Sequence, residues 1–351
     1  MERADKGLAF MMQYENVAWY DGGEVRILDR RVYPRRVQFV TCRTHREVAQ
    51  ALTDMVTQST GPFTAAAMGM ALAAWECRDR TAEQQVAYLE QAMDAISHAR
   101  PTTVGRMQLI CGGCLEAAKA ALERGVDDVA LAIRDYTVQT NNRRYSRVGQ
   151  MAAHLVEKFP DNGTVMTQCF GETIVAMMLK KCREQGKTIR LFCPETRPYF
   201  QGARLTALEM HAAGLDTTLL CDNAASSLMQ TGKVNIIFVG CDRVARNGDA
   251  ANKIGTSAVA ILAKHYGIPF YVCAPSSTID MSLASGAEIP IEQRAAEEIT
   301  EMWYKKRMAP EGVGVYNPAF DVTDHSLITG IITERGICTA PFEDAFRALG
   351  F

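Results

Sequence analysis

Residues 240–256 read GCDRVARNGDAANKIGT, and this stretch decides the fold class. Before it, residues 234–239 form a short apolar run rich in β-branched side chains, which is typical of a buried strand in a parallel sheet. Asp242 therefore follows the carboxyl end of a strand, where open α/β sheets bind their ligands. Asn252 and Lys253 are expected to begin a helix, whose backbone amides, together with the Lys253 ammonium, would suit a phosphate. The alternative is a solvated loop that ends in a helix cap.

Outward from this stretch, short apolar runs alternate with helical patterns. Strands are predicted at 164–167, 189–193, 217–221, 234–239 and 270–274. Helical spacing is found between them, as at 171–182 and 202–213. This alternation indicates βαβ units in a doubly wound sheet. The predicted fold class is α/β: a Rossmann-like parallel sheet domain, preceded by a mostly helical N-terminal domain with a small β cap.

The N-terminal part of the chain has a different pattern. Residues 14–42 are predicted to form short strands with a turn at Asp21-Gly22-Gly23. Residues 45–122 have helical spacing, which Arg100-Pro101-Thr102 and Gly112-Gly113 are expected to interrupt. We therefore predict two domains, residues 1–125 with the β cap and helices, and residues 126–351 as the Rossmann-like catalytic domain.

The composition excludes several functional classes. The net charge is -2 and no run of Lys or Arg stands out, so neither nucleic acid nor a membrane surface is an expected partner. No segment has the apolar length of a signal peptide or a membrane span, so a cytoplasmic location is expected. The eleven cysteines lie mostly in apolar segments, which favours reduced, buried thiols. Cys111 and Cys114 are the one close pair, and the Gly-rich fingerprints of dinucleotide and P-loop sites are missing, so no metal or organic cofactor is expected.

Cys169 is a second candidate for chemistry. It ends the predicted strand at 164–167, just before a predicted helix, where amide dipoles would stabilise a thiolate that could act as a base or nucleophile. A buried structural cysteine is the alternative. If this strand is a neighbour of the strand that ends before Asp242, the thiol and the carboxylate face one pocket.

The loop after the strand at 189–193 is rich in polar residues. It reads PETRPYFQGAR from Pro194 to Arg204. Arg197 and Arg204 could bind a phosphate, since the planar guanidinium matches phosphate oxygens, and Glu195 and Gln201 could bind sugar hydroxyls. A cluster of surface ion pairs is the alternative.

Blocks along nearly the whole chain resemble the methylthioribose-1-phosphate isomerase family, whose fold is shared with ribose-1,5-bisphosphate isomerases and with regulatory subunits of translation initiation factor 2B. The blocks include Trp19-Tyr20-Asp21-Gly22-Gly23, Arg100-Pro101-Thr102, Glu195-Thr196-Arg197-Pro198, Gln201-Gly202-Ala203-Arg204, the stretch at 240–256, residues 274–280 and 316–321.

The resemblance implies isomerisation of a 5-substituted ribose 1-phosphate to the ribulose 1-phosphate, by a homodimer without a metal or organic cofactor. It implies that Cys169 and Asp242 are catalytic. Asp242, kept protonated by an apolar pocket, would donate to the ring oxygen, and Cys169 would serve the hydrogen transfer between C1 and C2. The positions that match the family's phosphate- and sugar-binding residues are Arg100, Gln201, Asn252 and Lys253.

Three segments depart from the family's pattern. An Arg-Gly-Ala-Pro-Ala-Ile-Gly stretch is replaced at 57–64 by TQSTGPFT, so its phosphate-binding Arg is absent. Ala-Val-Asn is replaced by Thr103-Val104-Gly105, and Thr-His-Cys-Asn-Ala-Gly by TQCFGE at 167–172. These changes favour an altered ligand, and Arg106 could supply a replacement cation. The alternatives are a ribose-1,5-bisphosphate isomerase and a non-catalytic sensor of nucleotides or sugar phosphates, although a sensor has no need of Cys169 and Asp242.

Overall fold

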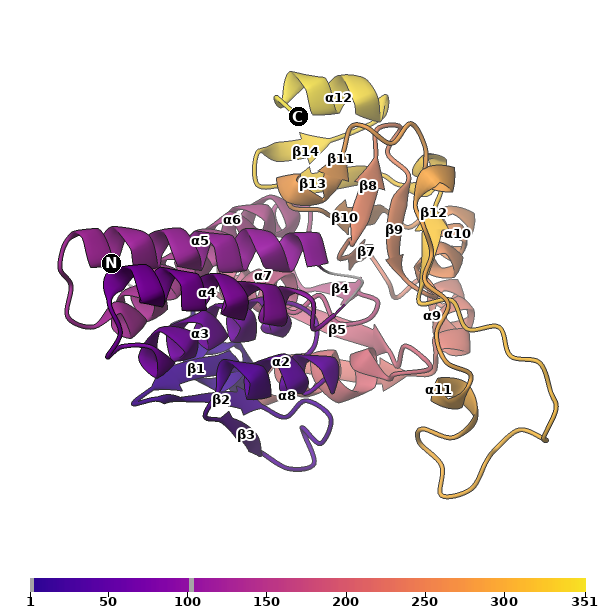
Figure 1. The fold of residues 1–351 in the computed structure, drawn as a ribbon. Coiled ribbons are helices and arrows are strands. Elements are labelled where there is room, and N and C mark those ends of the chain that lie inside the picture. The colour runs from indigo at the N-terminus through magenta and orange to yellow at the C-terminus, as the bar shows by residue number, and fades with distance from the viewer. Residues whose placement is uncertain (1–2, 101–103) are drawn as a thin grey trace. The chain divides into compact units, whose positions relative to one another are not determined.

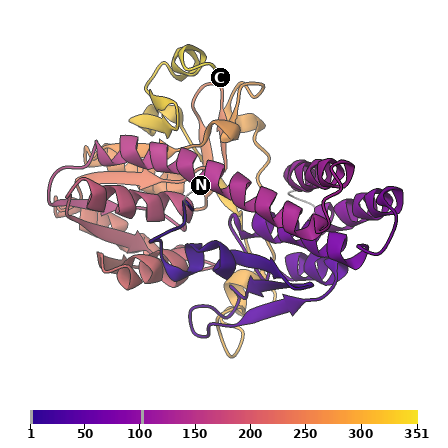
Figure 2. The ribbon, with the colours of Figure 1, turned by 90° about the vertical axis from the view of Figure 1, so that its left-hand side faces the viewer.

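The computed structural model describes residues 3–100 and 104–351 (Figures 1 and 2). By internal contacts the chain divides into two compact units, Met1–Ser146 and Arg147–Phe351. The sequence analysis places the boundary after residue 125, between α5 (Val104–Glu123) and α6 (Val129–Val156), whereas the division by contacts falls within α6. None of the helices in the described ranges has both the length and the apolar character to cross a membrane.

The first unit contains the predicted β cap and helices. An antiparallel sheet has the order β1 (Ala18–Asp21), β2 (Glu24–Leu28), β3 (Phe39–Cys42), which confirms the cap. The helix α3 (Gly61–Glu76) is buried almost all round, because small and apolar residues occupy every face of it. The other elements are η1 (Phe10–Met12), α1 (Tyr14–Val17), α2 (His45–Thr53), α4 (Ala82–Ser97), α5 and the start of α6.

The predicted break at Gly112-Gly113 is wrong, because α5 continues through both glycines. A Cβ at Gly113 would lie 2.3 Å from the hydroxyl oxygen of Tyr136 on α6, so the glycine lets these two helices approach closely. Close packing of the two helices thus outweighs the low helix propensity of glycine. Of the other predicted break, Pro101 and Thr102 lie outside the described residues.

The second unit is built on a seven-stranded sheet of order β14-β13-β10-β7-β4-β5-β6. All neighbouring strands are parallel except β13 and β14, which pair antiparallel. The five predicted strands are confirmed within about two residues, as β4 (Gly163–Met166), β5 (Ile189–Pro194), β6 (Asp216–Leu220), β7 (Ile236–Val239) and β10 (Phe270–Cys273). The hairpin of β13 (Gly330–Thr333) and β14 (Gly336–Cys338) was not predicted.

Helices and turns connect these strands (Figure 1). The predicted helices at 171–182 and 202–213 correspond to α7 (Thr173–Glu184) and to a π-helical turn (Gly202–Thr206) that continues into α8 (Ala207–Ala212). The remaining elements are η4 (Asp222–Ala224), α9 (Ala225–Gln230), α10 (Thr256–His265), η5 (Ser276–Thr278), η6 (Gly286–Glu288), α11 (Glu297–Thr300), η7 (His325–Leu327) and α12 (Phe342–Ala348).

A smaller mixed sheet has the order β11-β8-β9-β12. Its strands are β11 (Ile279–Asp280), β8 (Arg243–Ala245), β9 (Ala250–Lys253) and β12 (Phe320–Thr323). The prediction that Asn252 and Lys253 begin a helix is therefore wrong. They end β9, where they pair with Asp321 and Phe320 of β12, and the helix α10 begins at Thr256. The strand β12 lies far along the chain, so local sequence gave no sign of this pairing.

Candidate active site

The strand order brings Cys169 and Asp242 to one edge of the sheet. From β4, the chain adds β5 and β6 on one side and then crosses over to β7 on the other, so β4 and β7 flank the point where the order reverses. Ligands of open α/β sheets bind at this topological switch point, beyond the carboxyl ends of the strands. Cys169 follows β4 and Asp242 follows β7. The two strands are parallel neighbours, which confirms the condition for a shared site.

The backbone of Cys169 is held by two threonines. Its N–H donates to Thr196 Oγ1 at 3.0 Å, and its carbonyl oxygen accepts from Thr206 Oγ1 at 2.6 Å. Cys169 has a φ of 63°, a left-handed conformation that needs such support in a residue other than glycine. Both threonines are completely buried. Sequence reasoning did not single them out, because nothing local distinguishes a threonine that binds a distant backbone group.

Burial raises the pKa of the Cys169 thiol to about 11. The positive charge of Lys253 and the Phe170 amide act in the opposite direction, while Asp242 and Asp222 raise the pKa further. The helix α7 begins only at Thr173, beyond the position where its amides would contact the thiol. The expected stabilisation of a thiolate is thus outweighed by desolvation, and the thiol is protonated at neutral pH.

Asp242 is exposed and lies at the start of β8. Its backbone N–H donates to the Ala251 carbonyl oxygen at 3.0 Å, which ties it to β9. The residues of the second unit thus leave the Asp242 carboxylate exposed. The apolar pocket expected to keep this carboxyl protonated stays a prediction.

The side chains of Lys253 and Asn252, at the end of β9, make different contacts. The Lys253 Nζ lies 4.2 Å from the centroid of the Phe320 ring, and its charge acts on Cys169. Asn252 is buried, and its side-chain amide donates to Thr256 Oγ1 at 3.0 Å, which links β9 to α10. The structure therefore places Lys253 where its charge acts on the Cys169 thiol, and it gives Asn252 a partner within the fold.

The loop after β5, residues 195–204, is called the β5 loop. The Thr196 and Arg197 backbone N–H groups donate to Asp222, both at 2.7 Å, which fixes the start of the loop. Burial, with the Asp222 carboxylate, raises the pKa of Glu195. Gln201 is half-buried, and its Oε1 is buried without a hydrogen-bond partner among the described residues. The β5 loop therefore holds a buried acceptor without a partner among the described residues, and the same loop contacts Cys169 through Thr196.

A family model described as the initiation factor 2 subunit family matches residues 58–340. The chain is 42% identical to methylthioribose-1-phosphate isomerase from Symbiobacterium thermophilum, over 96% of both chains. The chain belongs to the methylthioribose-1-phosphate isomerase family. Two solved structures are similar to it in fold and sequence. One is 5-methylthioribose 1-phosphate isomerase from Pyrococcus horikoshii OT3, with a TM-score of 0.82, 36% identity and 95% of each chain covered. The other is translation initiation factor eIF-2B, subunit delta, from A. fulgidus, with a TM-score of 0.84, 31% identity, and 96% of this chain and 99% of that chain covered.

The departures from the pattern of the methylthioribose-1-phosphate isomerase family lie mostly in the first unit. Gln58 is buried, and its carbonyl oxygen accepts from the buried Arg30 at 2.7 Å. The guanidinium of Arg106, on α5, lies 4.4 Å from the Phe63 ring centroid. Arg100 is half-buried, beyond the end of α4. These residues belong to the first unit, so the geometry described above for the second unit does not include them.

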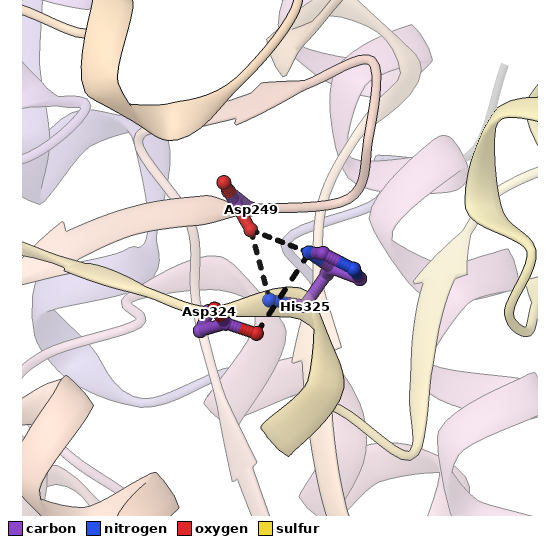
Figure 3. Close-up of side chains that lie close together, drawn as sticks. All are labelled: Asp249, Asp324 and His325. Carbon is purple, nitrogen blue, oxygen red and sulfur yellow. Dashed lines mark hydrogen bonds and ion pairs between the residues drawn. The ribbon is translucent and has the colours of Figure 1, made fainter.

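A carboxylate cluster outside this site consists of Asp249, Asp324 and His325 (Figure 3). Asp249 Oδ1 accepts from the backbone N–H of His325 at 2.9 Å and lies 2.8 Å from its Nδ1. Asp249 Oδ2 accepts from the Asn247 side chain at 2.8 Å and from the Gly286 N–H at 3.0 Å. Because N–H groups bind both carboxylate oxygens of Asp249, the cluster joins the turn before β9 to the start of η7.

Proposed function

We propose that this chain is an aldose-ketose isomerase. It converts 5-methylthioribose 1-phosphate, or a close 5-substituted relative such as 5-deoxyribose 1-phosphate, to the corresponding ribulose 1-phosphate. The observation that carries the proposal is the placement of Cys169 and Asp242 after neighbouring parallel strands at the topological switch point, with the Lys253 charge acting on the thiol. Membership in the methylthioribose-1-phosphate isomerase family supports it.

The chemistry needs an acid and a group that moves hydrogen. A phosphate on C1 prevents the ring from opening to a free aldehyde. A proton must therefore be delivered to the ring oxygen as the bond between this oxygen and C1 breaks. Hydrogen then leaves C2 and arrives at C1. The C2 hydroxyl becomes the ketone as its proton is released, which replaces the proton that the acid gave to the ring oxygen. The reaction is internal and needs no oxidant or reductant. Asp242 is the proton donor, and Cys169 serves the transfer between C2 and C1.

Substrate binding alters both groups. A ligand over the exposed Asp242 excludes water, which disfavours the charged carboxylate and favours the acid form that donates a proton. Cys169 rests as a thiol, since its pKa is about 11. To take a proton from C2 it must first lose its own proton to solvent, and Lys253 favours the negative charge that this leaves on the sulfur. Gln201, Asn252 and Lys253 are the second-unit residues proposed to bind the phosphate and sugar hydroxyls, with Gln201 Oε1 accepting a hydrogen bond from a hydroxyl. Arg100 is proposed as a phosphate ligand only from its match to the family's pattern.

We further propose that the enzyme acts in methionine salvage, that it is cytoplasmic and that it forms a homodimer. Light scattering on the purified protein should give twice the chain mass of 38.7 kDa. A monomeric mass would contradict the dimer without affecting the chemistry.

The function is tested by proton NMR with methylthioribose 1-phosphate, 5-deoxyribose 1-phosphate and ribose 1,5-bisphosphate in parallel. One substrate should turn over to its ketose, and Cys169→Ser and Asp242→Asn should each lower kcat by at least about 10²-fold, as expected for removal of an acid-base group. Cys221→Ser is the matched control, because Cys221 is an exposed thiol after β6. Wild-type activity in both site variants would overturn the two roles.

The second candidate is a non-catalytic sensor of nucleotides or sugar phosphates. The missing arginine at 57–64 favours it, as does the likeness to the eIF-2B delta structure. Binding of all three sugar phosphates without turnover would favour the sensor over the isomerase. Turnover of ribose 1,5-bisphosphate alone would instead identify a ribose-1,5-bisphosphate isomerase.

A further inference from the structure

Trp303 lies after α11 (Glu297–Thr300) and contacts the β5 loop. Its indole Nε1–H donates to the Pro198 carbonyl oxygen at 2.8 Å. Its ring meets Tyr199 and Phe200 edge-on, with centroids 6.0 and 5.6 Å away. The Arg204 guanidinium lies 4.7 Å from the centroid of the same ring. One side chain therefore contacts both halves of the β5 loop.

Arg197 makes a second link between the same two segments. Its Nη2 donates to the Ile299 carbonyl oxygen at 3.5 Å, at the limit of a hydrogen bond. Its guanidinium also lies 5.1 Å from the Phe200 ring centroid and 5.7 Å from that of Tyr304. The segment at 299–304 and the β5 loop are thus joined by aromatic, cationic and hydrogen-bond contacts, all within the second unit.

The β5 loop needs such support because its backbone is strained. Thr196 and Phe200 have φ values of 61° and 58°, a conformation that is strained in residues other than glycine and persists only where neighbours hold it. Gln201 directly follows Phe200. We propose that Trp303 is a positioning residue, which holds the β5 loop in this conformation and thereby places Gln201 for the sugar phosphate. The role of Gln201 in substrate binding rests on the proposed function, whereas the effect of Trp303 on the loop does not.

Hydrogen exchange on the ligand-free protein tests the structural step. Trp303→Ala should speed exchange of the hydrogen-bonded amides of Thr196, Arg197 and Phe200 by about tenfold or more, since loss of the indole removes a hydrogen bond and several ring contacts. Trp303→Phe keeps a ring and should have a smaller effect. Tyr316→Ala, which lies beyond the segment at 299–304 and is 80% exposed, is the control and should match the wild type. Unchanged exchange in Trp303→Ala would overturn the inference, even if the protein has no isomerase activity.

Steady-state kinetics test the second step. Trp303→Ala should raise KM by about tenfold, because Gln201 binds substrate. The change in kcat should be smaller, since Trp303 contacts the β5 loop from Pro198 onward, whereas Thr196, which holds Cys169, is itself held by Asp222. Trp303→Phe should have a KM much closer to the wild-type value than Trp303→Ala. In a double-mutant cycle with Gln201→Ala, the double variant should have nearly the KM of Gln201→Ala alone. Additive effects would show that Trp303 does not act through Gln201.

Discussion

At the scale of single residues, the Cys169 thiol differs from an ordinary exposed cysteine. Its pKa of about 11 means that its alkylation by iodoacetamide should be slow near neutral pH and should rise by about tenfold per pH unit up to about pH 11, because the thiolate is the reacting form. Lys253→Met should slow the reaction further, since loss of the cation raises the pKa. Mass spectrometry of the labelled peptides measures both, with the exposed Cys221 as an internal reference. A rate that levels off near pH 8 would contradict the buried, protonated thiol.

Thr196 links the β5 loop to Cys169 through one hydrogen bond. Thr196→Val keeps the β-branched shape but leaves the Cys169 N–H without its acceptor, which should cost about 1–3 kcal/mol of unfolding free energy. We also expect kcat to fall, because the thiol loses its fixed position. Thr217→Val on β6 is the control, since its hydroxyl donates only to a nearby carbonyl oxygen, that of Leu215. Urea unfolding compares the two variants, and equal losses would show that the Cys169 contact has no special weight.

At the scale of elements, Asp249 joins the start of β9 to η7 and η6. Burial by itself would raise the pKa of Asp249, but N–H groups of Asn247, Gly286 and His325 hold it below its ordinary value of 3.8. A depressed carboxyl pKa contributes stability above the unfolded value, and this contribution is lost as the pH falls through the folded pKa.

Asp249→Asn should therefore destabilise the protein by about 1–3 kcal/mol at neutral pH, and the difference from wild type should shrink below about pH 4. Denaturant unfolding across this pH range is the measurement. Asp324→Asn is the matched control from the same cluster, and its effect should be smaller because its carboxylate is exposed to water. A deficit that stays constant down to pH 3 would assign the effect to shape rather than charge.

At the scale of the whole molecule, the two units have separate hydrophobic cores. The core around Leu72 of α3 and the core around Val239 of β7 share no residue in the described ranges. Leu72→Ala should cost about 2–5 kcal/mol and speed hydrogen exchange in α3, α4 and α5, while β7 and β10 keep their protection. Val239→Ala should have the converse pattern. Equal acceleration in both units from either variant would mean that the chain unfolds as one cooperative body.

Much of this architecture could be predicted from local patterns. Apolar, β-branched runs marked β4, β5, β6, β7 and β10, because a strand buried on both faces needs apolar residues throughout. Continuous helical spacing marked the first unit. Glycine was a poorer guide, since both Gly112 and Gly113 lie inside α5, and Gly113 is there because α5 packs closely against Tyr136 of α6.

By itself the sequence determined the fold class, the family and the candidates Cys169 and Asp242, since these depend on residue type and on distance along the chain. The tertiary structure decided three further points. It decided that β4 and β7 are neighbours and that Asn252 and Lys253 belong to a strand paired with β12. It also decided that burial raises the pKa of the Cys169 thiol more than the charge of Lys253 lowers it. Each of these depends on groups that are far apart in the chain. Strand neighbours and local dielectric arise only when the chain is folded, so no local pattern could have supplied them.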